Sequence, residues 1–463
     1  MFPAQTYVDR RNRLTARLSG GLLLFLGNDE SAMNYAANTF HFRQDSTFLY
    51  FFGVDQPGWA ALVDLDEGRT TLFADDLTLD DIVWTGVLPT VAELAAGGGV
   101  TETRPAAALA SVVKDATARG RAVRFLPPYR PENRIKLFAL LGVHPDRQHD
   151  AASIELVRAI VEMRAVKSAE EVAEIERAVD TSVEMHLAAM RMVRPGMTEA
   201  EVAARVTEIA LAAGGQLAFP VIATIHGETL HNHHHGNTLK PGDLFLLDAG
   251  AETAAHYAGD LTSTFPVDAT FTPRQREVYR VVLDAHLAAV GACRPGVPFR
   301  DVHALACRTL AGGLKDLGLM KGNLDDAVAQ GAHAMFFQCG TGHMMGLDVH
   351  DMEDLGEVWV GYEGRPKSTQ FGLKSLRLAR PLKPGFVFTV EPGIYLIPEL
   401  ARRWRAEGRF AEFIDYGALE GWLGFGGVRI EENVLVTPEG SRILGKWRPR
   451  TAGEVEDVRA GRR

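Results

Sequence analysis

The sequence predicts a protein of the α/β (α+β) class with two domains. The chain has 463 residues, 46% of them apolar, which exceeds what one typical hydrophobic core accommodates. In the first third, short apolar runs alternate with turn residues, a pattern typical of a sheet with intervening helices. Later segments carry helix-start signals followed by long amphipathic stretches, which predict helices around further strands.

Four runs in the first third predict the strands of a central sheet, and they cover residues 20–27, 47–53, 59–65 and 69–74. Each run is rich in apolar residues and is bounded by turn residues. The segments ELAAG and ALASVVKDATARG predict helices between later strands. These elements together predict an α/β domain over residues 1–165.

A second domain is predicted over residues 166–463. Its start is marked by Ser-Ala-Glu-Glu at 168–171, a capping box in which the serine hydroxyl and the glutamate carboxylate satisfy free backbone N–H groups. The apolar spacing predicts a helix from there to about Met192. Thr-Glu-Ala-Glu at 198–201 repeats the signal for a second helix. The charged tail after residue 447 is expected to be mobile.

The second domain contains two internal echoes. MVRPGMTEAEV (192–202) and ACRPGVPFRDV (292–302) share an Arg-Pro-Gly turn between predicted helices. LKPGDLFLLD (239–248) and LKPGFVFTVE (382–391) align without a gap and end on a carboxylate. The repeats predict two related halves, each of which delivers a carboxylate from the end of a buried strand to one central point.

Five residues in this domain could together bind metal: Asp248, Asp260, His343, Glu391 and Glu431. Taken singly, an aspartate at a strand end can cap a turn, and a histidine can be an ordinary core residue. Buried carboxylates that lie together, however, need a cation or a proton. Five ligands exceed the need of one catalytic ion, so the set predicts two divalent ions with bridging carboxylates. An oxygen-rich set with one imidazole suits Mn²⁺ best, with Co²⁺ and Zn²⁺ as alternatives.

Composition excludes several other classes of protein. The formal charge of −10 argues against nucleic acid as the main partner. Three cysteines without a CxxC pair do not make a disulfide framework, which predicts a cytoplasmic protein. The sequence shows no signal peptide and no apolar run long enough to span a membrane.

The motifs in order resemble one known family. DAG, YAGDLTSTFP, GTGHMMGLDVHD, TVEPGIY and GGVRIEENVLV resemble the aminopeptidase P and prolidase branch of the pita-bread metallopeptidases, over about residues 165–445. FRQDSTFLYFFG resembles the creatinase-type N-terminal domain of aminopeptidase P. The resemblance implies a creatinase-like α/β domain, followed by a pita-bread domain with a pseudo-twofold repeat. It also implies a homo-oligomer, either a dimer or a tetramer.

The resemblance assigns a role to each metal ligand. Asp248 would chelate one ion, and Asp260 and Glu431 would bridge both. His343 and Glu391 would hold the other ion. The implied activity is hydrolysis of the Xaa-Pro bond, which releases the N-terminal residue from short peptides with proline second. A hydroxide that bridges the two ions would attack the scissile carbonyl.

The resemblance also implies catalytic and substrate-binding residues. Glu391 would shuttle the proton to the leaving proline nitrogen. His231 and His350 match the substrate-binding histidines of the family and would stabilise the tetrahedral intermediate. Arg429, which shares a strand face with Glu431, is expected to contact substrate.

Two further positions bear on specificity. Cys339 stands where many relatives carry histidine, so rate or specificity is expected to differ. GLKSLRLARPLKPG resembles prolidase, in which an arginine, here Arg377, grips the carboxylate of a dipeptide. A strict Xaa-Pro dipeptidase is therefore an alternative. Another pita-bread hydrolase and a non-enzymatic binding protein that kept the fold are further alternatives.

Overall fold

The computed structural model describes residues 1–462, and these form two compact units. The first consists of Met1–Arg164 with Glu353–Trp359, and the second consists of Ala165–Met352 with the chain from Val360 onward. The predicted two-domain α/β organisation is confirmed. The predicted second domain includes a short segment that groups with the first unit.

The first unit is built on a five-stranded sheet of order β6-β5-β4-β1-β7. Up to residue 165 the elements are α1 (Ala4–Thr15), β1 (Leu22–Leu26), β2 (Ala32–Tyr35), β3 (Asn38–Thr39), α2 (Ser46–Phe52), β4 (Ala60–Asp64), β5 (Arg69–Phe73), α3 (Leu79–Thr85), α4 (Val91–Gly97), β6 (Glu102–Arg104), α5 (Ala108–Ala118), β7 (Val123–Arg124), α6 (Pro131–Leu141), η1 (Pro145–Arg147), α7 (Gln148–Ala151) and α8 (Ile154–Ala165). Leu24, Leu62 and Phe73 of the sheet pack with Val113 of α5 in a buried core. Three predicted strands and both predicted helices are confirmed as β1, β4, β5, α4 and α5.

The prediction of a strand at 47–53 is wrong, because this segment is the helix α2. The Asp45 side chain accepts a hydrogen bond of 2.8 Å from the Phe48 N–H and caps the helix start. Gly53, at φ +66°, ends the helix in the left-handed conformation. All residues of α2 are buried. A short run of apolar residues lacks the periodicity that separates a buried helix from a buried strand.

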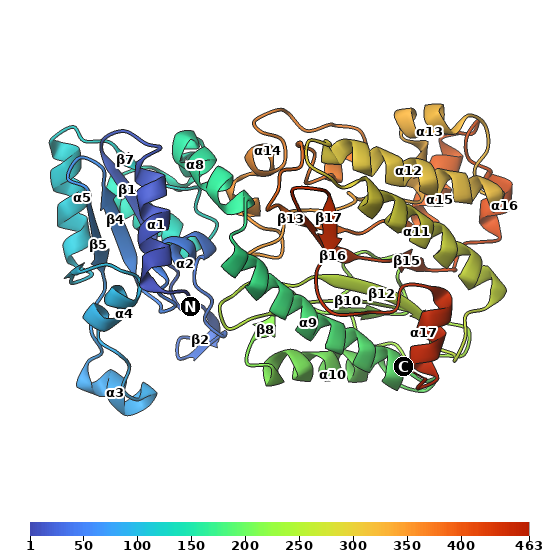
Figure 1. Cartoon of the computed structure of the whole chain (residues 1–463), viewed down its shortest axis with the longest axis horizontal. Helices are drawn as coiled ribbons and strands as arrows, with labels where there is room; N and C mark the ends of the chain where they lie inside the picture. The colour runs from blue at the N-terminus through green and yellow to red at the C-terminus, as the bar shows by residue number, and fades with distance from the viewer. Residues whose placement is uncertain (463) are drawn as a thin grey trace. The chain divides into compact units, whose positions relative to one another are not determined.

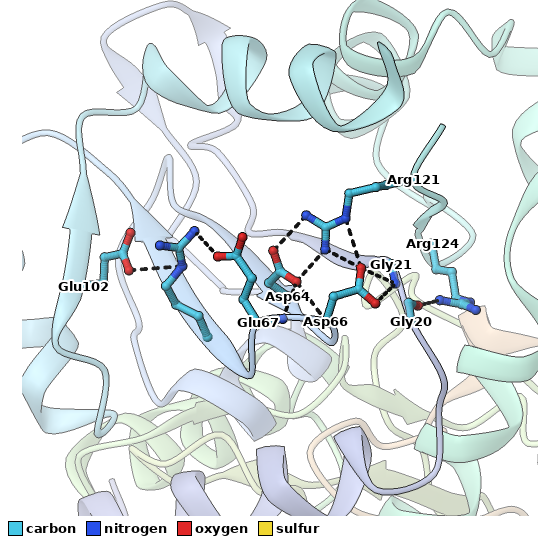
Figure 2. A network of polar contacts seen from close by, with 9 residues as sticks. Gly20, Gly21, Asp64, Asp66, Glu67, Glu102, Arg121 and Arg124 are labelled. Atoms are coloured by element: carbon cyan, nitrogen blue, oxygen red, sulfur yellow. Dashed lines mark hydrogen bonds and ion pairs between the residues drawn. The ribbon is translucent and has the colours of Figure 1, made fainter. Parts of the chain in front are cut away.

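An ion-pair network fixes the turn between β4 and β5 (Figure 2). Arg121 donates to Asp64 Oδ2 at 2.9 Å and to Asp66 Oδ2 at 3.0 Å. Asp66 also accepts from the Gly21 N–H at 3.1 Å. Because Gly21 directly precedes β1, the network ties the β4–β5 turn to the start of β1, the neighbour of β4 in the sheet.

The second unit contains two three-stranded sheets, ordered β12-β10-β9 and β13-β16-β17. Its elements, with the two short helices near residue 355, are α9 (Ala169–Met192), α10 (Glu199–Ala212), β8 (Gln216–Leu217), β9 (Ile222–Thr224), β10 (Leu244–Ala249), β11 (Ala251–Glu252), β12 (Leu261–Pro266), α11 (Pro273–Ala292), α12 (Phe299–Asp316), α13 (Leu324–Gln330), η2 (Ala332–Met335), η3 (Glu353–Leu355), α14 (Glu357–Val360), η4 (Leu373–Ser375), β13 (Val387–Val390), β14 (Gly393–Tyr395), α15 (Pro398–Ala406), α16 (Tyr416–Glu420), β15 (Gly427–Arg429), β16 (Glu432–Val436), β17 (Ser441–Ile443) and α17 (Ala452–Arg459). Both predicted capping boxes are present, at the starts of α9 and α10. Among residues 1–462, no helix is long and apolar enough to cross a membrane.

The two halves of this unit repeat the same local structure. The Gly196 N–H donates to Leu239 O at 2.8 Å, and the Gly296 N–H donates to Leu382 O at the same distance. Each bond joins an Arg-Pro-Gly turn to a Leu-Lys-Pro-Gly turn. The two helix pairs, α9–α10 and α11–α12, flank the Arg-Pro-Gly turns. The predicted repeat is therefore confirmed at the level of hydrogen bonds.

Helix α9 runs along the β12-β10-β9 sheet and packs against β10 and β12 (Figure 1). His186 of α9 is fully buried, and its ring joins both strands. Nε2 donates to Ala249 O at 3.0 Å, and Nδ1 accepts from the Ser263 hydroxyl at 2.9 Å. Since β10 carries Asp248, this histidine helps to position one of the predicted metal ligands.

We expect His186 to make the protein less stable in mild acid. Burial lowers its pKa from 6.5 to about 3. Below pH 6.5 the histidine is protonated in the unfolded chain but stays neutral in the folded chain. The free energy of unfolding therefore decreases as the pH falls from 6.5 towards 3. From pH 7 to pH 5 the loss should be about 2 kcal/mol. Urea unfolding of wild type and His186→Asn at both pH values tests this, and an equal pH dependence in the two proteins would contradict it.

The prediction that the tail is mobile is wrong. Residues 452–459 form α17, which packs against α9 and α11. Arg448 is 2% exposed and donates to Thr262 O at 2.8 Å, and Arg459 donates to Val267 O at 2.7 Å. Charged residues in this tail hydrogen-bond to backbone carbonyls of the core, a use of arginine that composition alone does not reveal.

Candidate active site

All five predicted metal ligands line one cavity of about 220 Å³ in the second unit. Asp248, Asp260, His343 and Glu431 are each less than 10% exposed, and Glu391 is partly buried. Four of the five come from ends of strands, and His343 comes from the loop that follows η2. The structure thus brings together residues that lie up to 183 positions apart in the chain.

Each half of the repeat contributes two carboxylates from neighbouring strand ends. In the first half β10 pairs with β12, and the Ala249↔Leu261 pair is flanked by Asp248 and Asp260. In the second half β13 pairs with β16 through Val390↔Glu432, and Glu391 and Glu431 lie beside that pair. Antiparallel pairing therefore places both acids of each half at one end of the ladder.

His343 faces the carboxylates with a defined tautomer. Its Nε2 lies 3.4 Å from Asp260 Oδ2 and 3.5 Å from Glu391 Oε1. Its Nδ1 lies 3.1 Å from Met344 O, which can only accept, so Nδ1 carries the proton. The Nε2 lone pair is consequently available to a cation, and Asp260, His343 and Glu431 offer ligand atoms within 4.8 Å of one another.

The electrostatics of the cluster call for positive charge. Burial, followed by the neighbouring carboxylates, raises the pKa of Asp260 and of Glu431 well above the usual range. Burial likewise raises the pKa of Glu391. Asp248 Oδ1 and Asp260 Oδ1 are buried without a hydrogen-bond partner among residues 1–462. Oxygen atoms of this kind, with one imidazole nitrogen, fit divalent cations.

Threonine hydroxyls orient the acids. Thr262 donates to Glu431 Oε2 at 2.6 Å, and Thr389 donates to Glu391 Oε1 at 3.1 Å. The Thr389 hydroxyl also accepts from the His343 N–H at 3.1 Å. Neither threonine was among the predicted site residues. Their signal was the period of two along a strand, which puts Thr389 on the same face as Glu391.

Arg429 is a buried neighbour of the cluster. It forms an ion pair with Asp248, and it donates to the Thr262 hydroxyl and to the Tyr395 hydroxyl, each at 3.0 Å. These bonds hold Asp248 and Thr262 in place. A contact between Arg429 and substrate stays a prediction, consistent with its place in the cavity wall.

The remaining predicted residues line the same cavity. His350 stacks edge-on against His343 with ring centroids 4.3 Å apart, and His231 is exposed at the wall. Arg377 is half-buried in the wall.

Cys339 also lines the cavity, at the position where many relatives carry histidine. Burial raises the pKa of its thiol to about 12, so this group is neutral at pH 7, whereas an imidazole could take up a proton.

Comparison with known proteins decides the family. The sequence profile of metallopeptidase family M24 matches residues 173–438, more than half of the chain. The chain belongs to metallopeptidase family M24. The N-terminal domain of aminopeptidase P matches residues 7–124 of this M24 peptidase. The predicted aminopeptidase P and prolidase branch and the predicted metal-dependent peptidase class are confirmed.

Relatives of this M24 peptidase are similar over nearly its whole length. It is 32% identical to the Xaa-Pro dipeptidase of Homo sapiens, with 99% of this chain and 94% of that protein covered. It is 31% identical to a probable Xaa-Pro aminopeptidase of Aspergillus niger, with 98% and 97% covered. The structure of proline aminopeptidase P II from Yersinia pestis matches with a TM-score of 0.82 and 28% identity, over 99% of this chain and 100% of that chain.

Proposed function

We propose that this M24 peptidase hydrolyses the peptide bond in front of proline, with Asp248, Asp260, His343, Glu391 and Glu431 holding two divalent ions, and that Mn²⁺ is the native metal. The observation that carries the proposal is the convergence of these five side chains in one cavity. The names of the relatives support proline as the second residue of the substrate.

When bound, two ions would supply Lewis acidity and lower the pKa of a shared water. The chain itself supplies the proton transfer. Burial raises the pKa of Glu391, which favours uptake of a proton by its carboxylate, and its Oε1 accepts a hydrogen bond from the Thr389 hydroxyl. His231 and His350 lie in the cavity wall and can donate hydrogen bonds to the carbonyl oxygen of the scissile bond.

The cavity wall also contains apolar side chains that suit a proline ring. Phe219, Pro220, Ile222, Leu230 and Val349 line the same cavity as the ligands. An apolar wall favours the pyrrolidine ring over charged side chains at the position after the scissile bond.

Metal removal tests the proposal. After treatment with EDTA we expect hydrolysis of Ala-Pro-Ala to fall by about 10³-fold or more, since several kcal/mol of transition-state stabilisation are lost, and to return with Mn²⁺. Co²⁺ and Zn²⁺ serve as comparisons for the native metal. Faster cleavage of Ala-Ala-Ala would indicate another hydrolase of this fold. No cleavage of any peptide by the protein with two ions bound would indicate a binding protein.

A strict Xaa-Pro dipeptidase is the second candidate, favoured by the place of Arg377 in the cavity wall. A guanidinium there could bind the carboxylate of a dipeptide with two hydrogen bonds.

We also propose that the chain forms a homodimer or homotetramer, and sedimentation equilibrium would measure its mass in solution. A cytoplasmic location stays a prediction from cysteine content.

A further inference from the structure

A second group of metal-type ligands lies outside the cavity described above. His303 and Cys307 are four residues apart on α12 and so share one helix face. His333 lies on η2. The three side chains are 3%, 1% and 4% exposed, and their ligand atoms lie within 4.8 Å of one another.

The geometry of the α12 pair matches a metal site. Cys307 Sγ lies 3.5 Å from His303 Nε2. In a tetrahedral zinc site, bonds of about 2.3 Å to sulfur and 2.0 Å to nitrogen put the two ligand atoms about 3.5 Å apart. The other ring nitrogen, His303 Nδ1, lies 2.8 Å from the Thr341 hydroxyl. When this hydroxyl accepts, Nδ1 carries the proton and the Nε2 lone pair is left for a metal.

The unpaired ring nitrogens of His333 indicate that a ligand binds here. Neither of its ring nitrogens has a hydrogen-bond partner among residues 1–462, although the side chain is buried. An S–H···N bond between Cys307 and His303 would account for those two residues without any ion, but it leaves His333 unsatisfied. Burial also lowers the pKa of His333 to about 4, so the ring is in the neutral, ligand form. The rings of His303 and His333 have centroids 6.5 Å apart, and closure around an ion needs a shift on the order of 1 Å.

We propose that His303, Cys307 and His333 bind one Zn²⁺ ion at a site separate from the dinuclear centre. Thiolate and imidazole ligands favour zinc over Mn²⁺, which prefers oxygen. Binding replaces the thiol proton of Cys307, which is released to solvent.

The consequence is structural. Thr341, the hydrogen-bond partner of His303, is two residues before His343, and its carbonyl accepts from the Glu391 N–H at 2.8 Å. An ion at this site would join α12 and η2 and would brace the segment that carries two of the dinuclear ligands.

Metal analysis of the full-length protein tests the site without an activity assay. In protein saturated with Zn²⁺ we expect three zinc ions per chain in the wild type, two in the dinuclear centre and one at this site, and we expect two in Cys307→Ala and in His333→Gln. Cys293→Ala is the matched control and should keep three, because Cys293 is buried elsewhere and its thiol donates to Ala289 O at 3.2 Å. Two ions in the wild type, or an unchanged count in both site variants, would overturn the proposal.

Spectroscopy of the wild type decides the matter even where a variant fails to fold. The five side chains of the dinuclear centre include no thiolate, so a thiolate-to-metal charge-transfer band in the cobalt-loaded protein, or a zinc–sulfur distance of about 2.3 Å by X-ray absorption, reports this site alone. Absence of both signals would overturn it. Cys339→Ala should keep the band. Its loss there, with retention in Cys307→Ala, would also contradict the assignment.

Discussion

Replacing Glu431 by glutamine should lower kcat/KM for Ala-Pro-Ala by about 10³-fold or more, since several kcal/mol of metal-dependent stabilisation are lost. Glu431 is 2% exposed, and its ligand atom lies within reach of Asp260 and His343. An amide keeps the shape of the side chain but removes the charge that would bridge two cations. We expect the variant to hold at least one ion per chain fewer than the wild type, measured by mass spectrometry of the two purified proteins.

The adjacent residue provides the matched control. Glu432 is buried to the same degree but forms ion pairs with Arg448 and Arg450, at 3.1 and 2.8 Å. Breaking a buried pair costs about 3 kcal/mol or more, so Glu432→Gln should unfold at lower urea concentration and still hold the two dinuclear ions. If Glu431→Gln kept both ions and full activity, or if Glu432→Gln lost them while folded, the assignment of Glu431 as a ligand would be wrong.

Replacing Arg377 by alanine should separate the two candidate substrates. If Arg377 binds the carboxylate of a dipeptide, the loss of a charge-assisted, bidentate contact should lower kcat/KM for Ala-Pro by about 100-fold, or roughly 3 kcal/mol. A longer peptide carries its carboxylate further from the scissile bond, so Ala-Pro-Ala-Ala should change by less than about threefold.

The same comparison identifies what Arg377 does. Arg377→Lys should recover part of the dipeptide activity, because it restores the charge without the fork of two donors. Lys374→Ala, at an exposed position three residues away, is the control for general effects on this segment. If Arg377→Ala lowered kcat/KM equally for both peptides, Arg377 would not be the residue that binds the dipeptide carboxylate. That result would favour the aminopeptidase.

Asp248 and Glu391 could be predicted as a pair because each half of the second unit repeats the same turn and strand before the acid. Leu-Lys-Pro-Gly fixes where β10 and β13 begin, with Gly242 and Gly385 both at φ +88°. The strand length then fixes where Asp248 and Glu391 end up. Repetition of local structure is visible in sequence, and symmetry turns it into convergence in space.

Other features could not be predicted, because they depend on contacts between distant segments. The apolar run of α2 resembles a strand in sequence, and the cap that Asp45 provides marks it as a helix. The charged tail resembles a mobile segment in sequence, but Arg448 donates a hydrogen bond to Thr262 O, 186 residues earlier in the chain. The hydrogen bond from the Thr262 hydroxyl to Glu431 exists because the fold brings β12 next to the segment before β16, and the sequence does not show that these two segments are neighbours. Burial of polar side chains follows from such contacts and not from composition.

The most direct test is a crystal structure of the manganese-loaded protein with anomalous diffraction data at the manganese edge. We expect two anomalous peaks roughly 3.5 Å apart, which is the usual spacing of paired catalytic ions, with carboxylate oxygens of Asp260 and Glu431 touching both. One peak or none in the cavity that Asp248, His343 and Glu391 line would contradict the account.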